Sequence, residues 1–565
     1  MAQTEELIMT CLAYDTLFDD FSTVDIKKVV SSIPCIAALN FIIAKHNHFY
    51  YSLSDLDGQK NELYELRCSF WGDKKILQRL DAFILEQNNP YLIDNISTLY
   101  FELYILEYAD KQNVNVNLTQ EQKVSVYKLY LYCSNLWLGV QQKNMEKLDI
   151  LDLNLKVDIP VTEFKFPADF HVQLYKANEF FIFCENVSPY NIISKWFVHD
   201  KGKNNFQEYI LDLFELFRHT ITTHIFKKSM LSPATHWFLD KYCIDSTIPE
   251  NLCQDKNKGI RYLRDHFFVK MNDDSFILLS PTFLIDKFYQ GLIFEVWEAV
   301  KKRIGKESIA DNIKDFTVLK SMLGRPFSEE HLFYSLMEKC FTSISQVRKK
   351  GSELIGVDAP PDYYLREENN IFFFECKDLL MNNDIRYSTD LNVIKKEILS
   401  KICKDSSSNR KGGAQLLFTI DKYINENILS KFDRPYSTDD NIYPIIVTTD
   451  SAYDAYGVNL LLSVRFFEII KEKYSSLVGK IKPPIIINMD CFVKLMNDLH
   501  TRNIKFNELL DVYLFQYIQK SGMRMMPSFY HYIRTMYHTK LFTKDELQYM
   551  FGSLFNSLGK IVGKA

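Results

Sequence analysis

The sequence predicts a multidomain protein of mixed α+β or α/β class, with a helical N-terminal domain and a C-terminal mixed sheet flanked by helices. At 565 residues and 47% hydrophobic composition, the chain exceeds the roughly 250–300 residues at which a single core stops growing. Apolar side chains recur every three or four residues through residues 1–155, a spacing typical of helices. Residues 316–565 instead alternate strand-like and helix-like patterns.

These patterns divide the chain into three expected domains. Residues 1–155 form the helical domain, and residues 156–312 form a mixed α/β domain. Residues 316–565 form the sheet domain with a helical extension at its C-terminus. The best boundary is RIGKESIADNIKD, residues 303–315, because this polar segment separates two hydrophobic helices.

In the middle domain, residues 155–166 and 179–187 look like strands, whereas residues 206–226 look like an amphipathic helix. Residues 259–300 predict a helix, a hairpin that turns at residues 272–274, and a second helix. This order is compatible with a DNA-reading winged helix at the end of the domain. It is also compatible with many ordinary α+β pieces.

Charge and cysteine content narrow the classes of function. From residue 316 onward, 33 basic and 29 acidic side chains give a net charge of +4, whereas the preceding residues carry −9. A polyanionic ligand therefore suits the C-terminal part better. The eleven cysteines include no C-x-x-C pair, which argues for a reducing cytoplasm and against a zinc site. We expect a soluble, cytoplasmic protein with no membrane segment.

The stretch PPDYYLREENNIFFFECKD, residues 360–378, places ionisable groups on an apolar hairpin. Alternate residues of a strand face opposite sides, so Phe373, Glu375 and Lys377 share one face while Phe374 and Cys376 share the other. Asp362 enters the neighbouring strand and is expected to come close to Glu375.

Two adjacent carboxylates repel each other unless a cation lies between them. Mg²⁺ prefers hard oxygen ligands and is typically held by one or two carboxylates together with water and phosphate oxygens. A lysine two residues beyond the second carboxylate would lie beside the metal-bound water or the charged transition state. Asp362, Glu375 and Lys377 therefore suit phosphodiester hydrolysis with Mg²⁺ or Mn²⁺.

Pro361-Asp362, followed after twelve residues by Glu375-Cys376-Lys377, resembles the motif of the PD-(D/E)XK nuclease superfamily, which has the restriction-endonuclease-like fold. The resemblance covers residues 320–450, where helix, three strands, helix and strand follow in the order of that family's core. It implies that Asp362 and Glu375 bind the metal and that Lys377 is the catalytic lysine.

The resemblance also implies three further site residues. The backbone carbonyl of Cys376 would be an additional metal ligand. The family often has an acid on its first helix, for which Glu330 is the first choice, with Glu329 and Glu338 as neighbours. Gln415 occupies the place of a glutamine that many members carry on the helix after the lysine.

Each of these residues also has an ordinary structural interpretation. Residues 372–374 are expected to be core phenylalanines with no role in base stacking. Glu375 and Lys377 would form a solvated ion pair on an edge strand, although an edge this apolar invites aggregation. Asp362 would be a turn residue after Pro361.

Other patterns carry less information. No P-loop motif occurs, so intrinsic ATPase activity is not expected. His46 and His48 form a His-x-His pair without a nearby partner ligand, and surface or capping positions suit them better than a metal site. The basic residues of the 395–411 segment fit either a phosphate track or a solvated face; they are Lys395, Lys396, Lys401, Lys404, Arg410 and Lys411.

The first hypothesis is a metal-dependent nuclease that cleaves DNA rather than RNA, with an N-terminal half that selects substrate, protein partner, a second copy of the chain or trigger. Bacterial proteins that resemble this family act in restriction, repair or antiviral defence against phage, and defence is the preferred context here. An inactive nuclease fold kept for interaction or nucleic-acid binding is the second hypothesis. An RNA-cleaving effector is the third.

Overall fold

The computed structural model describes the following parts of the chain: residues 10–52, 55–113, 115–145, 148–244, 248–354, 360–406, 409–519, 526–537 and 543–562. The chain divides into two compact units. Unit 1 consists of residues 1–147, 164–169 and 208–288, and unit 2 of residues 148–163, 170–207 and 289–565. Both units take segments from the region expected to be the middle domain.

Unit 1 is mainly helical, as expected for the N-terminal residues. Its elements are β1 (Thr10–Cys11), α1 (Tyr14–Leu17), α2 (Ile26–Val30), α3 (Cys35–Tyr51), α4 (Leu56–Ser69), α5 (Lys74–Glu86), β2 (Pro90–Tyr91), α6 (Asn95–Tyr108), α7 (Gln120–Met145), α11 (Phe206–Thr220), β3 (Ile225–Lys227), α12 (His236–Lys241), α13 (Lys256–Asp265), β4 (Phe268–Lys270), β5 (Ser275–Leu278) and α14 (Pro281–Asp286).

The last part of unit 1 contains the expected hairpin. Strand β5 pairs antiparallel with β4 and with β3, which gives a small sheet in the order β3-β5-β4. Helix α13 precedes this hairpin and α14 follows it, an order compatible with a winged helix and equally with an ordinary α+β arrangement. A Cβ atom on Gly259 of α13 would lie 2.9 Å from Leu103 Cδ1 of α6. Helix α13 is therefore covered on that side by the helical part of its own unit.

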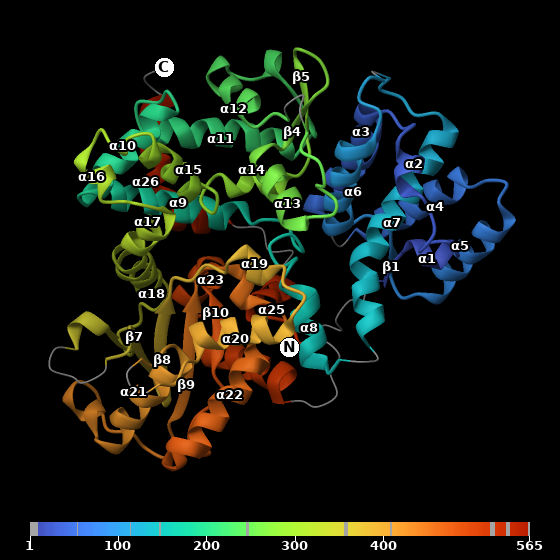
Figure 1. Ribbon diagram of the computed structural model, residues 1–565. Helices are drawn as coiled ribbons and strands as arrows, with labels where there is room; N and C mark the ends of the chain where they lie inside the picture. The colour runs from blue at the N-terminus through green and yellow to red at the C-terminus, as the bar shows by residue number, and fades with distance from the viewer. Residues whose placement is uncertain are drawn as a thin grey trace. The chain divides into compact units, whose positions relative to one another are not determined.

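Unit 2 contains the larger sheet (Figure 1). Its elements are α8 (Ile150–Asp158), α9 (Phe170–Asn186), α10 (Tyr190–Asp200), α15 (Leu292–Lys301), α16 (Ser308–Asp311), α17 (Phe316–Leu323), a π-helical segment (Gly324–Phe333), α18 (Tyr334–Cys340), β6 (Val347–Lys350), β7 (Tyr363–Glu367), β8 (Asn370–Lys377), α19 (Asn383–Arg386), α20 (Leu391–Ile402), α21 (Gly413–Asn425), β9 (Asn441–Thr448), α22 (Val458–Lys473), β10 (Ile485–Asn488), α23 (Met489–His500), α24 (Phe506–Leu514), a second π-helical segment (Phe515–Gln519), α25 (Phe529–Tyr537) and α26 (Lys544–Val562).

Two strands expected in the middle region are wrong. Residues 179–187 belong to α9 and the start of the following turn, and residues 155–166 contain the end of α8 followed by turns. Phe180, Phe181 and Phe183 are all buried within α9. A helix buried on most of its surface presents the same short apolar run as a buried strand, so periodicity alone does not separate them.

The larger sheet has the strand order β10-β9-β8-β7-β6. Strands β6, β7 and β8 are successively antiparallel, whereas β9 runs parallel to β8 and β10 parallel to β9. The parallel pairs need crossover connections, which α19 to α21 and α22 supply. The helix, three strands, helix and strand expected for residues 320–450 therefore follow in that order.

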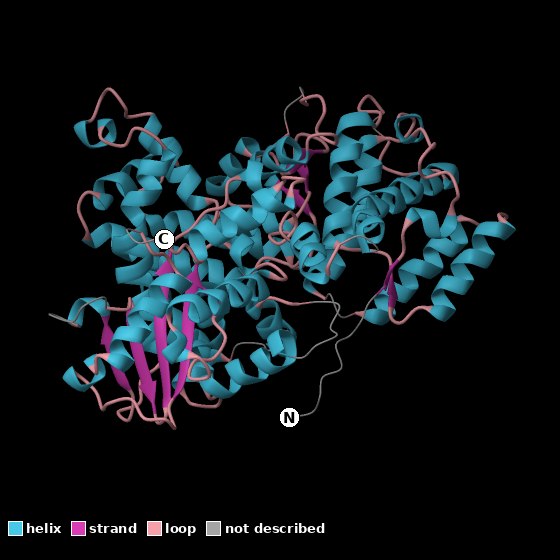
Figure 2. Ribbon diagram, turned by 60° about the horizontal axis from the view of Figure 1, so that its bottom comes forward, coloured by secondary structure: helices cyan, strands magenta, loops and turns pink. Residues whose placement is uncertain are grey.

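Helices cover both faces of this sheet (Figure 2). On one face, Tyr364, Phe373 and Ile446 pack with residues of α20, α21 and α22 in one core. On the other face, the ring of Phe374 lies 6.2 Å from that of Phe333 and 6.3 Å from that of Phe492 on α23. The phenylalanines of residues 372–374 are fully buried, which confirms the expectation that they form core.

The first of the three strands expected within residues 320–450 is β6, Val347–Lys350, and residues 351–353 form a 3₁₀ turn directly after it. The strand is hard to predict because Arg348, Lys349 and Lys350 give this segment no alternation of apolar and polar residues. They suit its position, because lysine on an edge strand discourages pairing with another chain.

Candidate active site

The hairpin of β7 and β8 brings the predicted acids together. Tyr363, the first residue of β7, pairs with Phe374 in the antiparallel register. Asp362 lies in the bend directly before Tyr363 and therefore next to Glu375, the residue after Phe374. Burial raises the pKa of Asp362, and the nearby charge of Glu375 raises it further. The expected approach of these two carboxyl groups is thus present.

Glu375 and Lys377 share a face of β8, as the alternation predicts. The Lys377 ammonium forms an ion pair with Glu375 Oε1, and Glu375 is only 1% exposed. The side chain of Gln415, in the first turn of α21, also hydrogen-bonds to Glu375. The structure therefore brings Gln415, Glu375 and Lys377 into one contact group, and the pair does not lie on a solvated edge strand.

Asp362 is held from the other side by the backbone. Its Oδ2 accepts a hydrogen bond of 2.7 Å from the amide of Cys376. This contact fixes the carboxyl group at the start of β7 against the end of β8. The proposed role of Cys376, ligation through its backbone carbonyl, stays a prediction.

Burial and like charge shape the electrostatics of the site. Burial raises the pKa of Asp362, and the neighbouring Glu375 raises it further. Burial also raises the pKa of Glu375, although Lys377 opposes this shift. For Lys377, burial lowers the pKa, but Glu375 and Asp362 outweigh it and the net shift is upward. Lys377 is therefore a cation at neutral pH.

Glu329, rather than Glu330, is the acid of the first helix that faces this group. Burial and the charge of Asp362 raise the pKa of Glu329 to about 7, and Tyr334 donates a hydrogen bond of 3.2 Å to its Oε1. Glu330 points elsewhere and pairs with the exposed Arg325 at 3.0 Å. The placement of Glu330 in the site is thus corrected in favour of its neighbour, and Glu338 pairs with Lys350.

The local helix geometry explains why Glu329, and not Glu330, lies in the site. Residues 324–333 form a π-helical segment that starts at Gly324 and contains Pro326. A π-helix has more residues per turn than an α-helix, so side chains after its start are rotated away from the positions that a 3.6-residue period gives. The prediction of Glu330 assumed the period of an α-helix, which does not apply to this segment.

A second contact group adjoins the site. Asp378, directly after Lys377, accepts hydrogen bonds from Lys320 Nζ at 2.5 Å and from Thr449 Oγ1 at 2.7 Å. It ties α17 and the end of β9 to the end of β8. Sequence reasoning missed this group, because nothing in the spacing of three residues so far apart indicates their contact.

The negative charge of the carboxyl groups in the site suits a divalent cation. Burial raises the pKa values of Asp362, Glu375 and Glu329, and like charge adds to each shift: Glu375 acts on Asp362, Glu329 on Glu375, and Asp362 on Glu329. A hard cation relieves this kind of repulsion. Within the described parts of the chain, no group of three or more His, Cys, Asp or Glu side chains is arranged to hold a metal ion. Two carboxylates with water are a common way of binding Mg²⁺.

The basic residues of the 395–411 segment do not form one free track. Lys395 pairs with Asp152, and Lys401 lies 3.9 Å from Glu397. The guanidinium of Arg410 lies 4.3 Å from the ring centre of Phe418. Lys396 and Lys404 are exposed. These contacts favour the solvated face over the phosphate track for much of residues 395–411.

Comparison of the chain with family models, with characterised proteins and with solved structures gives no match. Among the described helices, none combines the length and the apolar character needed to cross a bilayer.

Proposed function

We propose that unit 2 is a metal-dependent nuclease of the PD-(D/E)XK kind, which hydrolyses phosphodiester bonds and prefers DNA to RNA. The observation that supports this proposal is the proximity of Asp362 to Glu375, with Lys377 paired to Glu375 on the same face of β8. The mixed sheet supports it, because three antiparallel strands are followed by a helix and a parallel strand.

Each residue of the site has its own proposed role. Asp362 and Glu375 would hold Mg²⁺ or Mn²⁺, which when bound lowers the pKa of a water molecule and neutralises phosphate charge. Lys377 places a fixed positive charge beside the phosphate that is attacked. Gln415 orients the Glu375 carboxyl group, and Glu329 adds negative charge that favours cation binding.

The test is cleavage of labelled DNA and RNA by the full chain with Mg²⁺, Mn²⁺ or EDTA. We expect metal-dependent cleavage of DNA that falls by at least about 100-fold in Glu375→Gln and in Lys377→Ala. Lys471→Ala, an exposed residue of α22, serves as the matched control with unchanged activity. Circular dichroism checks that each variant is folded.

The outcomes separate the three hypotheses. Cleavage of RNA alone would replace the DNA nuclease by an RNA-cleaving effector. Nucleic-acid binding that is independent of metal and unaffected by Lys377→Ala, without cleavage of either substrate, would favour a fold kept for interaction. Cleavage that survives both substitutions would place the active site elsewhere.

A further inference from the structure

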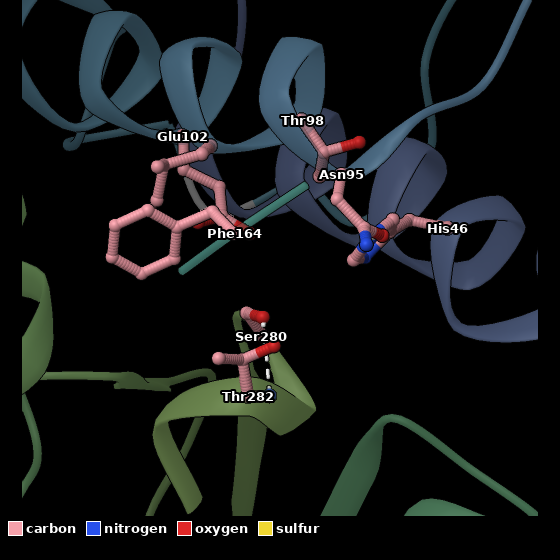
Figure 3. A pocket seen from close by; sticks show the side chains of 8 residues that line it. His46, Asn95, Thr98, Glu102, Phe164, Ser280 and Thr282 are labelled. Atoms are coloured by element: carbon pink, nitrogen blue, oxygen red, sulfur yellow. Dashed lines mark hydrogen bonds between the residues drawn. The ribbon is translucent and has the colours of Figure 1, made fainter. Parts of the chain in front are cut away.

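The small polar space in unit 1 has no room for a ligand larger than water (Figure 3). It lies between His46, Asn95, Glu102 and Phe164 and has the volume of about one water molecule. His46 is 2% exposed, and its Nε2 lies 2.8 Å from Asn95 Oδ1. It is therefore a buried residue and not the surface or capping residue expected from its sequence neighbourhood. A larger ligand must bind at a surface instead, and an exposed cation, Arg325, lies beside the acids of unit 2.

Arg325 belongs to the π-helical segment that also carries Glu329. Its side chain is 75% exposed, and its Nε donates a hydrogen bond of 3.0 Å to Glu330 Oε1. The two residues are five apart, which is the spacing that the hydrogen bonds of a π-helix join. Among the described residues, neither Nη group of Arg325 has a hydrogen-bond partner. Glu330 thus holds the guanidinium at one end and leaves its two Nη groups to a ligand.

The start of the π-helical segment lies against the end of the strand that carries the proposed active site. Asp378 directly follows β8, and a Cβ atom on Gly324 would lie 3.5 Å from Asp378 Oδ2. Arg325 is the next residue after Gly324. The contact of Gly324 therefore places Arg325 beside the end of β8, where Lys377 is the last residue.

The charge of Arg325 reaches two acids of the proposed active site. Burial raises the pKa values of Glu329 and Asp362, and the guanidinium of Arg325 opposes both shifts. Such an effect needs a short distance, because salt screens exposed charges that are more than about 8–10 Å apart. Arg325 therefore lies at the exposed edge of the group formed by Asp362, Glu375 and Glu329.

Lys377 and Arg325 are two cations with different surroundings. The side chain of Lys377 is 22% exposed and pairs with the buried Glu375, whereas that of Arg325 is 75% exposed and pairs with the accessible Glu330. An exposed ion pair contributes little to the stability of a fold. The fold therefore depends little on Arg325, and the charge of this side chain is available to a ligand.

A nucleic-acid strand offers charges that match these two cations. The strand carries a phosphate at every nucleotide, so a strand with one phosphate at Lys377 presents a neighbouring phosphate to the edge of the site. A guanidinium binds two phosphate oxygens through parallel N–H bonds, and the Nη groups of Arg325 supply such bonds. Contacts of this kind position the strand and do not depend on base sequence.

We propose that Arg325 binds, through its Nη groups, a backbone phosphate next to the one that is cleaved, and that Glu330 orients the guanidinium. This inference rests on the nuclease function proposed above and adds a residue that binds the substrate. Lys377 acts at the attacked phosphate, whereas Arg325 holds the strand in place. Arg325 therefore contributes to the affinity for nucleic acid and to KM more than to kcat.

Fluorescence anisotropy of labelled duplex DNA with the full chain measures this contact. Ca²⁺ replaces Mg²⁺ as the oxygen-binding cation, and gel electrophoresis confirms that the DNA stays intact. Dissociation constants are compared between about 50 and 200 mM salt. We expect Arg325→Ala to weaken binding about 5- to 10-fold and to reduce the slope of log Kd against log salt concentration by about 1.

Two further variants separate a phosphate contact from a general loss of charge. Arg325→Lys keeps the charge but lacks the planar fork, so we expect the salt slope of the wild type and an affinity between those of the wild type and Arg325→Ala. Arg465→Ala is the matched control, because Arg465 of α22 is also an arginine paired with an exposed glutamate, Glu468, at 2.8 Å. Its Kd and salt slope should equal those of the wild type. Circular dichroism checks that all variants are folded.

Cleavage kinetics in Mg²⁺ give a second measurement. Because Arg325 holds the strand and does not touch the attacked phosphate, Arg325→Ala should raise KM about 5- to 10-fold and change kcat by less than about twofold. Arg465→Ala should change neither constant. A loss of kcat with unchanged KM in Arg325→Ala would contradict the proposal, because it would make Arg325 part of the chemical step.

The binding results also separate this inference from the nuclease proposal. An unchanged Kd and salt slope in Arg325→Ala would overturn the phosphate contact, and the nuclease proposal would still stand on the loss of cleavage in Lys377→Ala. The absence of DNA binding by the wild type would overturn the contact as well. Weaker binding by Arg325→Ala in a chain that cleaves neither DNA nor RNA would support the contact and reject the nuclease.

Discussion

Asp362, in the bend directly before β7, lies beside Glu375 of β8, one step beyond the paired residues Tyr363 and Phe374. Burial raises the pKa values of both carboxyl groups; the charge of Glu375 raises that of Asp362 further, and the charge of Glu329 raises that of Glu375. The amide of Cys376 and the ammonium of Lys377 hold these carboxyl groups in place. The hairpin thus keeps the buried Glu375 and the partly buried Asp362 together at the cost of electrostatic repulsion.

Divalent cations are expected to stabilise the protein through this pair. Mg²⁺ or Mn²⁺ should raise the melting temperature of the wild type, because the ion relieves the repulsion between Asp362 and Glu375. Asp362→Asn should lose most of this rise and, in EDTA, should be at least as stable as the wild type. Differential scanning calorimetry with and without the ion measures both effects. A cation response that is unchanged in Asp362→Asn would contradict the assignment of the site.

The raised pKa of Glu329 makes stability depend on pH. The pKa of this carboxyl group rises from 4.5 to about 7 on folding, so between these values the folded chain retains a proton that the unfolded chain has lost. Stability is therefore lost as pH rises through this window, and the loss is complete above pH 7. Glu329→Gln should remove this component, so its stability relative to the wild type should grow from pH 4.5 to 7 and then level off.

Urea unfolding at several pH values, without divalent ions, checks this expectation. Glu330→Gln is the matched control, because the two glutamates are adjacent but Glu330 pairs with Arg325 outside the acidic group. Its profile should parallel that of the wild type. If Glu330→Gln removed the pH dependence and Glu329→Gln did not, the helix would present the other acid to the site.

Gln415 is expected to act by positioning Glu375. Gln415→Ala should reduce cleavage by about 10- to 100-fold, the usual effect of removing a residue that orients a metal ligand. The concentration of Mg²⁺ needed for half-maximal activity should rise, and addition of more Mg²⁺ should recover part of the activity. Glu426→Gln, an exposed substitution just after the same helix, should change neither quantity. Full activity of Gln415→Ala at low Mg²⁺ would refute this role.

Phe373 is expected to stabilise the sheet rather than to contact substrate. It is 0% exposed, and its ring centre lies 5.5 Å from that of Tyr364 and 5.4 Å from that of Tyr423. Phe373→Ala should lower the free energy of unfolding by about 3–5 kcal/mol. Val464→Ala, at a residue that is 49% exposed, should change it by less than about 0.5 kcal/mol. Urea titrations compare the two.

Local patterns in the sequence predicted many features of unit 2. The alternation in residues 371–378 predicted which side chains share a face, and the hairpin expected for residues 360–378 predicted that Asp362 comes close to Glu375. Both depend only on the two-residue period of a strand and on contacts close in the sequence. The alternation of strands and helices expected for residues 316–565 continues after β9 as α22, β10 and α23.

The remaining features depend on context that local patterns do not contain. The aromatic run of α9 has the composition of a strand, and only its burial within a helical layer makes it helical. Glu329 replaces Glu330 because the π-helical segment alters the rotation of the helix. The contacts of Asp378 with Lys320 and Thr449 join residues from three distant elements.

The region around the sheet also depends on residues 158–176, which lie far before its first strand, Val347–Lys350, in the sequence. Asp158 of α8 accepts a hydrogen bond of 2.9 Å from the backbone amide of Tyr456. Glu163 pairs with the buried Arg386, and Lys176 of α9 pairs with Asp490 at 2.7 Å. A fragment cut at residue 316 would keep Arg386, Asp490 and the Tyr456 amide but lose these partners. The sheet region is therefore not a detachable module, and a shortened or fused chain that includes it must also include residues 148–163 and 170–207 of unit 2.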